Sequence, residues 1–250
     1  MKTIRIREIE IGAGMPKICV PVTGVTVSEI LEQTAQAVEK QPDLLEWRAD
    51  FFESLTEPEK VHEMAGKMRD ILKNIPMIFT VRTSREGGNC HISTEDYCNL
   101  LSQAAENPEI DLIDVELYRD VQQMKVLIAR LKEKGKRVIA SNHHFDRTPV
   151  RTTMERILAE MDDSGADIRK LAVMPGSPEN VLDLLYATSH ANWSGKAPVI
   201  TMSMGSLGSL SRISGQIFGS AVTFGTVGEA SAPGQLAIDE LRIIMKILKL

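Results

Sequence analysis

The feature that most constrains the fold of this sequence is a repeat in which a short apolar run is followed by a helical pattern. Counting from residue 17, about eight such strand–helix units follow one another at a spacing of roughly 30 residues. The apolar runs predict strands over residues 17–22, 44–49, 77–82, 112–117, 137–142, 170–174, 198–202 and 221–224. The helical patterns cover residues 26–40, 57–74, 94–106, 121–134, 152–164, 178–193, 210–218 and 235–249.

This repeat predicts the α/β fold class and a (β/α)8 TIM barrel that takes up residues 1–250 as a single domain. An open, doubly wound sheet is the alternative, but no Gly-x-Gly-x-x-Gly motif follows the first strand. Residues 3–11 alternate between isoleucine and charged side chains, which predicts a short N-terminal β-hairpin closing the bottom of the barrel.

Charge and cysteine content narrow the class of protein. The formal net charge is -5 without a basic stripe, which argues against a nucleic-acid-binding protein. Cys19, Cys90 and Cys98 match neither a disulfide framework nor a zinc-site spacing, so we expect reduced thiols. The N-terminus does not read as a signal peptide and no apolar run is long enough for a bilayer, so we expect a cytoplasmic protein without membrane association.

Lys170 opens the predicted strand 170–174, where an ammonium group is costly to bury without a partner. One interpretation is a side chain whose stem lies on apolar surface while its charge reaches water. The other is a neutral amine held in a dry pocket, where it can attack a carbonyl group.

Active sites of this fold lie at the C-terminal ends of the strands, and polar residues gather at those positions here. Glu46 and Arg48 share a face of the second strand, where they either pair with each other or also contact a hydroxylated ligand. Thr80 and Arg82 share a face of the third strand. Glu86 lies just beyond, in a segment that is otherwise read as a solvated turn.

The next two strands add carboxylates and histidines. Asp114 and Glu116 share a face, and a salt bridge to a neighbouring arginine is favoured over a metal site. His143 and His144 are adjacent, so they face opposite sides of a strand and are poor joint metal ligands. We expect His143, which shares its parity with Ser141, to point inward and to act as a base.

The last two units carry the remaining candidates. Arg212 lies in a Gly/Ser-rich segment and can bind a carboxylate with its forked guanidinium group. The loop of residues 230–235 is either a lid over the barrel mouth or a tight turn before the last helix. Arginines in excess indicate an anionic substrate, and a lysine with a histidine indicates imine chemistry on a ketone.

A set of short motifs, in order along the whole chain, resembles the type I 3-dehydroquinase family, the Schiff-base dehydratases of the shikimate pathway. The motifs are Glu46-Trp47-Arg48-Ala49-Asp50, Phe79-Thr80-Val81-Arg82, Glu86-Gly87-Gly88, Ser141-x-His143, Asp167-Ile168-x-Lys170, Met202-Ser203-Met204-Gly205, Ser211-Arg212 and Ser231-Ala232-Pro233-Gly234-Gln235. No single motif is specific, but their order and spacing together are.

The resemblance implies a role for each candidate residue. Lys170 would form an imine with the C3 ketone of 3-dehydroquinate, His143 would act first as base and then as acid, and Glu86 would orient His143. Arg212 would bind the substrate carboxylate. The remaining substrate-binding residues it implies are Glu46, Arg48, Arg82, Ser231 and Gln235, the last two in a closing loop.

The resemblance also implies a homodimer that uses no metal and no added cofactor and releases 3-dehydroshikimate and water. Asn142, His144 and Pro21 depart from the residues of some relatives. Two alternatives stay open: another Schiff-base lyase, such as an aldolase acting on a sugar phosphate, and a non-catalytic barrel that binds an anionic metabolite.

Overall fold

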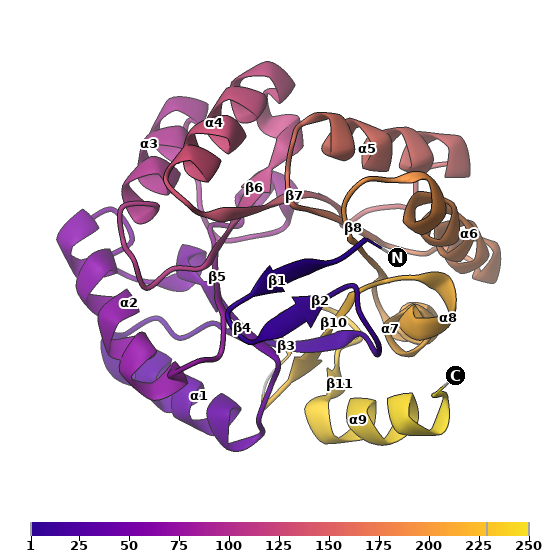
Figure 1. Ribbon diagram of the computed structural model, residues 1–250, viewed down its shortest axis with the longest axis horizontal. Helices are drawn as coiled ribbons and strands as arrows, with labels where there is room; N and C mark the ends of the chain where they lie inside the picture. The colour runs from indigo at the N-terminus through magenta and orange to yellow at the C-terminus, as the bar shows by residue number, and fades with distance from the viewer. Residues whose placement is uncertain (1, 229, 250) are drawn as a thin grey trace.

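The computed structural model describes residues 2–228 and 230–249, and in this part of the chain parallel strands form a ring inside a layer of helices (Figure 1). The strands of the ring are β3 (Lys17–Val22), β4 (Leu44–Arg48), β5 (Met77–Thr80), β6 (Leu112–Glu116), β7 (Arg137–His144), β8 (Ile168–Val173), β9 (Val199–Ser203) and β10 (Val222–Thr226). The strands are largely buried because each contacts the ring interior on one face and the helices on the other, and β4, β5, β6, β8 and β9 are buried throughout.

The ring closes in two places. Strand β10 pairs in parallel with β3, so the last strand lies beside the first. On the other side, Val199 of β9 forms an isolated bridge with Ser220, and the Ala221 N–H donates to the Val199 carbonyl at 2.8 Å. Sequential parallel order with closure confirms the predicted (β/α)8 barrel, and the open-sheet alternative is wrong.

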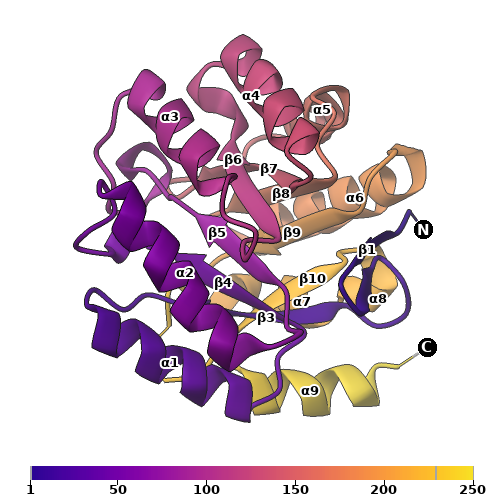
Figure 2. The ribbon, with the colours of Figure 1, turned by 60° about the vertical axis from the view of Figure 1, so that its left-hand side comes forward.

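The outer layer, seen from two sides in Figure 1 and Figure 2, encloses the larger apolar core. Its helices are α1 (Val27–Glu39), α2 (Pro58–Leu72), α3 (Thr94–Ala104), α4 (Val121–Glu133), α5 (Arg151–Asp163), α6 (Pro178–Ser194), α7 (Ser209–Ile213), α8 (Gly215–Phe218) and α9 (Ile238–Ile247). Thr26 caps α1 in a capping box with Glu29. Among the described residues, none of these helices has the length and apolar character needed to cross a membrane.

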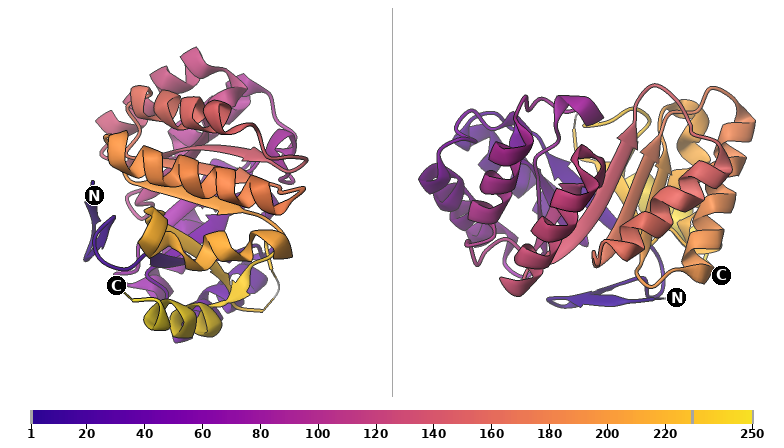
Figure 3. Two further views of the ribbon diagram at one scale, coloured as in Figure 1. Left: turned by 90° about the vertical axis from the view of Figure 1, so that its right-hand side faces the viewer. Right: turned by 90° about the horizontal axis from the view of Figure 1, so that it is seen from above.

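A hairpin of β1 (Ile4–Ile6) and β2 (Ile9–Ile11) lies across the N-terminal ends of the strands (Figure 3, right). Its alternating sequence buries Ile6 and Ile11 against the apolar residues that fill the lower barrel, as predicted. The ion pair of Arg7 with Asp111, at 2.6 Å, fastens the hairpin to the barrel. A ligand can therefore enter the barrel only from the opposite end, where the C-terminal ends of the strands lie.

Three element boundaries differ from the sequence-based predictions. Strand β8 begins at Ile168, so Lys170 is its third residue. Arg169 points outward and is buried, with its guanidinium group 3.2 Å from Asp162. A charged residue at this place favoured a loop in the sequence-based prediction. Strand β5 ends at Thr80, since the Arg82 N–H donates to Asp50 and not to a neighbouring strand.

The predicted helix 210–218 is two short helices, α7 and α8, which meet at Ser214. The predicted last helix over 235–249 begins only at Ile238, because β11 (Leu236–Ala237) first pairs with β10. Neither difference was detectable from apolar spacing, since both segments keep a helical pattern.

We expect Ile11→Ala to lower the free energy of unfolding by about 2 to 4 kcal/mol, because it leaves a cavity where the hairpin meets the barrel. Chemical denaturation followed by circular dichroism measures this change. Ile243→Ala, at a side chain that is 60% exposed, is the control and should change stability by less than about 0.5 kcal/mol. Equal stabilities for the two variants would contradict the closing role of the hairpin.

Candidate active site

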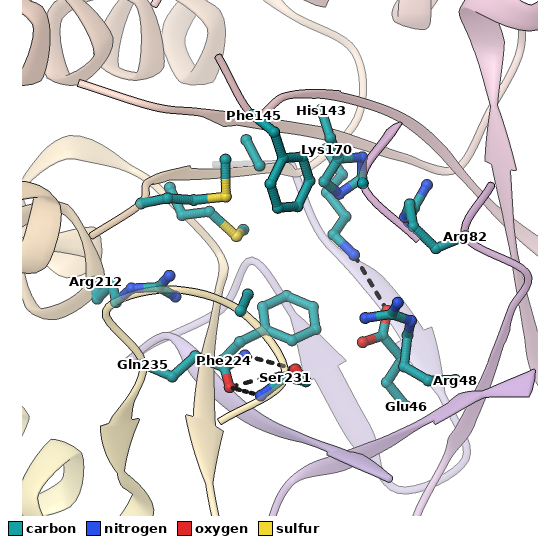
Figure 4. A pocket seen from close by; sticks show the side chains of 15 residues that line it. Glu46, Arg48, Arg82, His143, Phe145, Lys170, Arg212, Phe224, Ser231 and Gln235 are labelled. Atoms are coloured by element: carbon teal, nitrogen blue, oxygen red, sulfur yellow. Dashed lines mark hydrogen bonds and ion pairs between the residues drawn. The ribbon is translucent and has the colours of Figure 1, made fainter. Parts of the chain in front are cut away.

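A cavity of about 490 Å³ lies at the C-terminal ends of the strands (Figure 4). Side chains reach it from β4, β7, β8, β9 and β10, from α7 and from the loops after β5 and β10. The predicted site residues that line it are Glu46, Arg48, Arg82, His143, Lys170, Arg212, Ser231 and Gln235. Glu86 does not line the cavity; it lies behind His143.

Lys170 points from β8 into the cavity and is only 4% exposed, so a side chain that carries its charge to water is the wrong interpretation. Its Nζ lies 3.2 Å from Glu46 Oε1 and 3.4 Å from Asp114 Oδ2. The ring of Phe224 lies beneath it, with 4.5 Å from Nζ to the ring centroid. The other interpretation, an amine held in a dry pocket, agrees with this burial, and the structure adds two carboxylate partners that sequence reasoning did not give.

His143 points inward as predicted and is held by Glu86. Its Nδ1 lies 2.8 Å from Glu86 Oε2, and the Asn142 amide donates to Glu86 Oε1 at 2.9 Å. When Glu86 is ionised, the Nδ1–H donates to it, and Nε2 then carries a lone pair that can accept a proton. Asn142 thus has a defined place in the network around the imidazole.

Glu86 is buried although Ser84 and Arg85 of the same turn are exposed, so the alternative of a solvated turn is wrong at Glu86 itself. Gly87 ends its 3-10 turn, η2 (Ser84–Glu86), with φ at +78°. A Cβ at this position would lie 2.5 Å from the ring of Phe145, which itself stacks on His143. Glycine therefore permits both the backbone path and the close approach of the ring.

Burial and charge set the protonation of this pair in opposite directions. Burial, followed by repulsion from Arg82 and Lys170, holds the pKa of His143 well below its usual value. Burial, followed by the negative charge of Glu116, raises the pKa of Glu86 to about 8. At neutral pH these shifts leave the imidazole of His143 uncharged and keep a proton on the Glu86 carboxyl group. The two groups therefore titrate as a pair.

Arg82 lies at the centre of a buried ionic cluster. Its guanidinium group is 2.9 Å from Asp114 and 3.1 Å from Glu116, and it lies 3.6 Å from Glu86. The predicted salt bridge from Asp114 and Glu116 to a barrel arginine is confirmed. Within the described residues, no three His, Cys, Asp or Glu side chains are grouped so that they could hold a metal ion.

Glu46 and Arg48 share the inner face of β4, as their spacing predicts, but they do not pair with each other. Arg48 forms a two-pronged ion pair with Asp50, at 2.8 Å for each hydrogen bond. Glu46 accepts from the Thr80 hydroxyl at 2.9 Å and from Lys170. The turn after β4 brings Asp50 back over Arg48, which spacing within the strand does not reveal.

Arg212 lies across the cavity from Arg48 and Arg82 (Figure 4). It is 3% exposed, yet it appears in none of the ion pairs among the described residues. One guanidinium nitrogen donates to the Pro233 carbonyl at 2.9 Å, and the buried Nε–H has no acceptor. Burial lowers the pKa of Arg212 to about 10. A buried cation without a counterion is suited to bind an anion.

The loop of residues 230–235 covers the Arg212 side of the cavity, which agrees with the lid interpretation. The Ser231 N–H donates to Gln235 Oε1 at 2.9 Å, so the loop closes on itself. The Pro233 carbonyl also accepts from the Gly205 N–H at 3.1 Å. A Cβ on Gly234 would lie 2.3 Å from the Gly205 carbonyl, so only glycine allows this contact.

Sequence reasoning missed part of the cavity wall. Phe145 and Phe224 supply its aromatic surface, and Met202 and Met204 fill it as expected for methionines. Phe224 shares parity with Val222, whose side chain belongs to the inner apolar cluster, so alternation along β10 was the available signal. The contact of Lys170 with Asp114 had no such signal, because it joins strands that are not neighbours in the ring.

We expect the imidazole of His143 to stay neutral at about pH 6, where a histidine with the ordinary pKa of about 6.5 is mostly protonated. Nitrogen chemical shifts of ¹⁵N-labelled protein across a pH titration measure this. In the matched variant Lys170→Met the titration should move to higher pH, because one repelling cation is gone. A wild-type ring that titrates above pH 6.5 would contradict the assignment.

Comparison with known proteins shows which family the chain resembles. The family model described as type I 3-dehydroquinase matches residues 18–250. A 3-dehydroquinate dehydratase from Lactiplantibacillus plantarum is 44% identical over 247 residues, which cover 99% of this chain and 98% of that protein.

Two solved structures share the whole fold. The 3-dehydroquinate dehydratase of Geobacillus kaustophilus superimposes with a TM-score of 0.96 at 41% identity, covering 99% of this chain and 96% of that one. The type I enzyme of Clostridium difficile, solved with covalently modified comenic acid, gives a TM-score of 0.95 at 37% identity, covering 99% and 98%. On the match of its sequence and its barrel over nearly their full length, the chain belongs to the type I 3-dehydroquinase family.

Proposed function

We propose that this protein removes water from 3-dehydroquinate to give 3-dehydroshikimate, through an imine formed on Lys170. The observation that carries the proposal is the meeting of three groups in one cavity: the buried amine of Lys170, the neutral imidazole of His143 and the unpaired guanidinium of Arg212. A ketone that also bears a carboxylate and hydroxyl groups matches these three groups.

In the proposed reaction, Nζ of Lys170 attacks the C3 ketone, and the carbonyl oxygen leaves as water to give a protonated imine. His143 Nε2 then takes a proton from C2, and the electron pair of that C–H bond moves into the imine as an enamine. The enamine expels the C1 hydroxyl group, which receives the proton from His143 and leaves as water. Hydrolysis of the product imine uses one water and restores Lys170, so one water is lost in total.

The neighbouring residues support these steps. Glu46 and Asp114 can accept the proton that Lys170 must lose before it attacks. Glu86 directs the imidazole and stabilises its protonated form between the two proton transfers.

The remaining lining residues are proposed to hold the substrate. Arg212 would bind its carboxylate, while Glu46, Arg48 and Arg82 would bind its ring hydroxyl groups on the other side of the cavity. Ser231 and Gln235 would close over it. This chemistry needs no cofactor, because the lysine imine itself accepts the electron pair.

Three further expectations belong to this proposal. The catalytic unit is the single barrel domain of residues 1–250. The protein is cytoplasmic, which is supported by the free thiols of Cys19, Cys90 and Cys98. The protein forms a homodimer, for which the outer face of α6 is the best-supported surface (Figure 3, left).

This face carries apolar side chains that a monomer would leave in water. Leu182, Tyr186 and Trp193 are 62%, 55% and 89% exposed and lie on one side of α6. Glu179 lies at one end of the stripe and His190 near the other. An antiparallel arrangement with a second copy would therefore bring opposite ends together and bury the apolar centre.

We expect purified protein to form ultraviolet-absorbing enone from 3-dehydroquinate, and borohydride added during turnover to inactivate it with ligand mass on Lys170. Lys170→Ala should lose both activity and adduct, because no amine remains. His143→Ala should still give the adduct but lose most turnover, since proton transfer stalls. Wild-type protein that binds substrate without making enone would contradict the proposal and favour the binding-barrel alternative.

We expect light scattering after gel filtration to give wild-type protein twice the chain mass of 27.7 kDa. The double variant Leu182→Glu/Trp193→Glu should give the single mass, because charges replace the apolar contact. Val126→Glu, at an exposed residue of α4, is the control and should remain double. A monomeric wild-type protein would contradict the dimer, and a dimeric double variant would contradict this surface.

A further inference from the structure

Glu116, at the end of β6, is a fully buried carboxylate that does not line the cavity. Its Oε1 accepts from the Thr83 N–H at 2.7 Å and from Arg82 at 3.1 Å. Its Oε2 accepts from the Thr83 hydroxyl at 2.6 Å. Both oxygens thus hold the first residues of the loop after β5.

Thr83 continues this chain of contacts to the imidazole. Its carbonyl accepts the N–H groups of Glu86 and Gly88, each at 2.9 Å, and so forms the turn that carries the Glu86 carboxylate. Glu86 in turn holds His143 at 2.8 Å. The path from Glu116 to His143 therefore consists of short hydrogen bonds between buried groups.

We propose that Glu116 is a positioning residue of this site, which fixes the Glu86 turn through Thr83 and imposes its negative charge on the Glu86–His143 pair. The proposal rests on the dehydratase function proposed above. Glu116 would touch neither the substrate nor the reacting atoms.

The charges around the pair support the second half of this proposal. Burial and then the charge of Glu116 raise the pKa of Glu86, and Arg82 opposes them. Removing the charge of Glu116 would therefore lower the pKa of both members of the pair, since a nearby anion favours the protonated form of each. The other charged or titratable groups that face the pair are Arg48 on β4, Asp114 on β6, His144 on β7 and Lys170 on β8.

The variant that tests this proposal should remove the charge of Glu116 and keep its structural contacts. The main-chain N–H of Glu116 donates to the Tyr97 hydroxyl at 3.0 Å, and this bond does not depend on the side chain. Glutamine at position 116 keeps the shape and one acceptor oxygen, and its amide can donate to the Thr83 hydroxyl. Glu116→Gln thus removes the charge while it keeps the shape of the side chain, which Glu116→Ala would not.

The test compares Glu116→Gln with wild type in two measurements. In the pH dependence of kcat, the acidic limb should move down by about half a pH unit or more, and kcat should fall roughly fivefold. The ¹⁵N titration of His143 in the free protein should move in the same direction by a similar amount, and this readout does not require turnover. Borohydride trapping on Lys170 should persist.

A second pair of variants separates position from charge. Thr83→Val removes the hydroxyl but leaves the carboxylate charged, so we expect kcat to fall roughly fivefold while the acidic limb stays in place. Thr83→Ser keeps the hydroxyl and should recover most of the lost kcat. This pair also tests the proposal if Glu116→Gln fails to fold.

Three results would overturn the inference. An unmoved titration of His143 in Glu116→Gln would remove the electrostatic role, even if stability falls. Equal kcat in Thr83→Val and Thr83→Ser would remove the positional role. Wild-type activity with an unchanged Glu116→Gln profile would reject the inference alone, whereas inactive wild-type protein would reject the proposed dehydratase function.

Discussion

The site depends on one constraint: the guanidinium of Arg82 is buried inside the barrel and must be neutralised there. A buried cation is stable only with close anionic partners, and Asp114, Glu116 and Glu86 surround it. These partners are shared with the rest of the site, since Asp114 also contacts Lys170 and Glu86 also holds His143. The amine and the imidazole are thus placed by the same charge, which explains why residues from three strands and the loop after β5 act as one unit.

The barrel separates stability from chemistry along its axis. Below Lys170 the interior is apolar and is closed by the hairpin, with Ile11 fully buried. Around and above it, inward positions of β4, β6 and β7 carry Glu46, Arg48, Asp114 and His143, and each of these is held by a second polar side chain. The apolar lower layer excludes water from beneath the site, so its ion pairs act in a medium of low dielectric constant and keep their geometry.

Much of this arrangement could be predicted from the sequence, because alternation along a strand fixes which side chains face inward. Parity alone separated His143 from His144 and put Glu46 and Arg48 on one face. Parity could not predict which side chains form ion pairs with each other. Arg48 pairs with Asp50 through a local turn, and Lys170 reaches Asp114 through the tilt and packing of strands far apart in sequence. The start of β8 was misplaced because Arg169 is buried outward against Asp162, and propensity does not foresee a charge in that place.

Arg212 has a second consequence beyond its lack of a counterion. The same guanidinium that faces the cavity also donates to the Pro233 carbonyl, so an anion bound as proposed would share this side chain with the covering loop. Occupancy of the cavity and the position of the loop would then be thermodynamically linked, and each would change the equilibrium of the other by the same factor. Arg212 would thus couple binding in the cavity to the position of the loop at the barrel mouth.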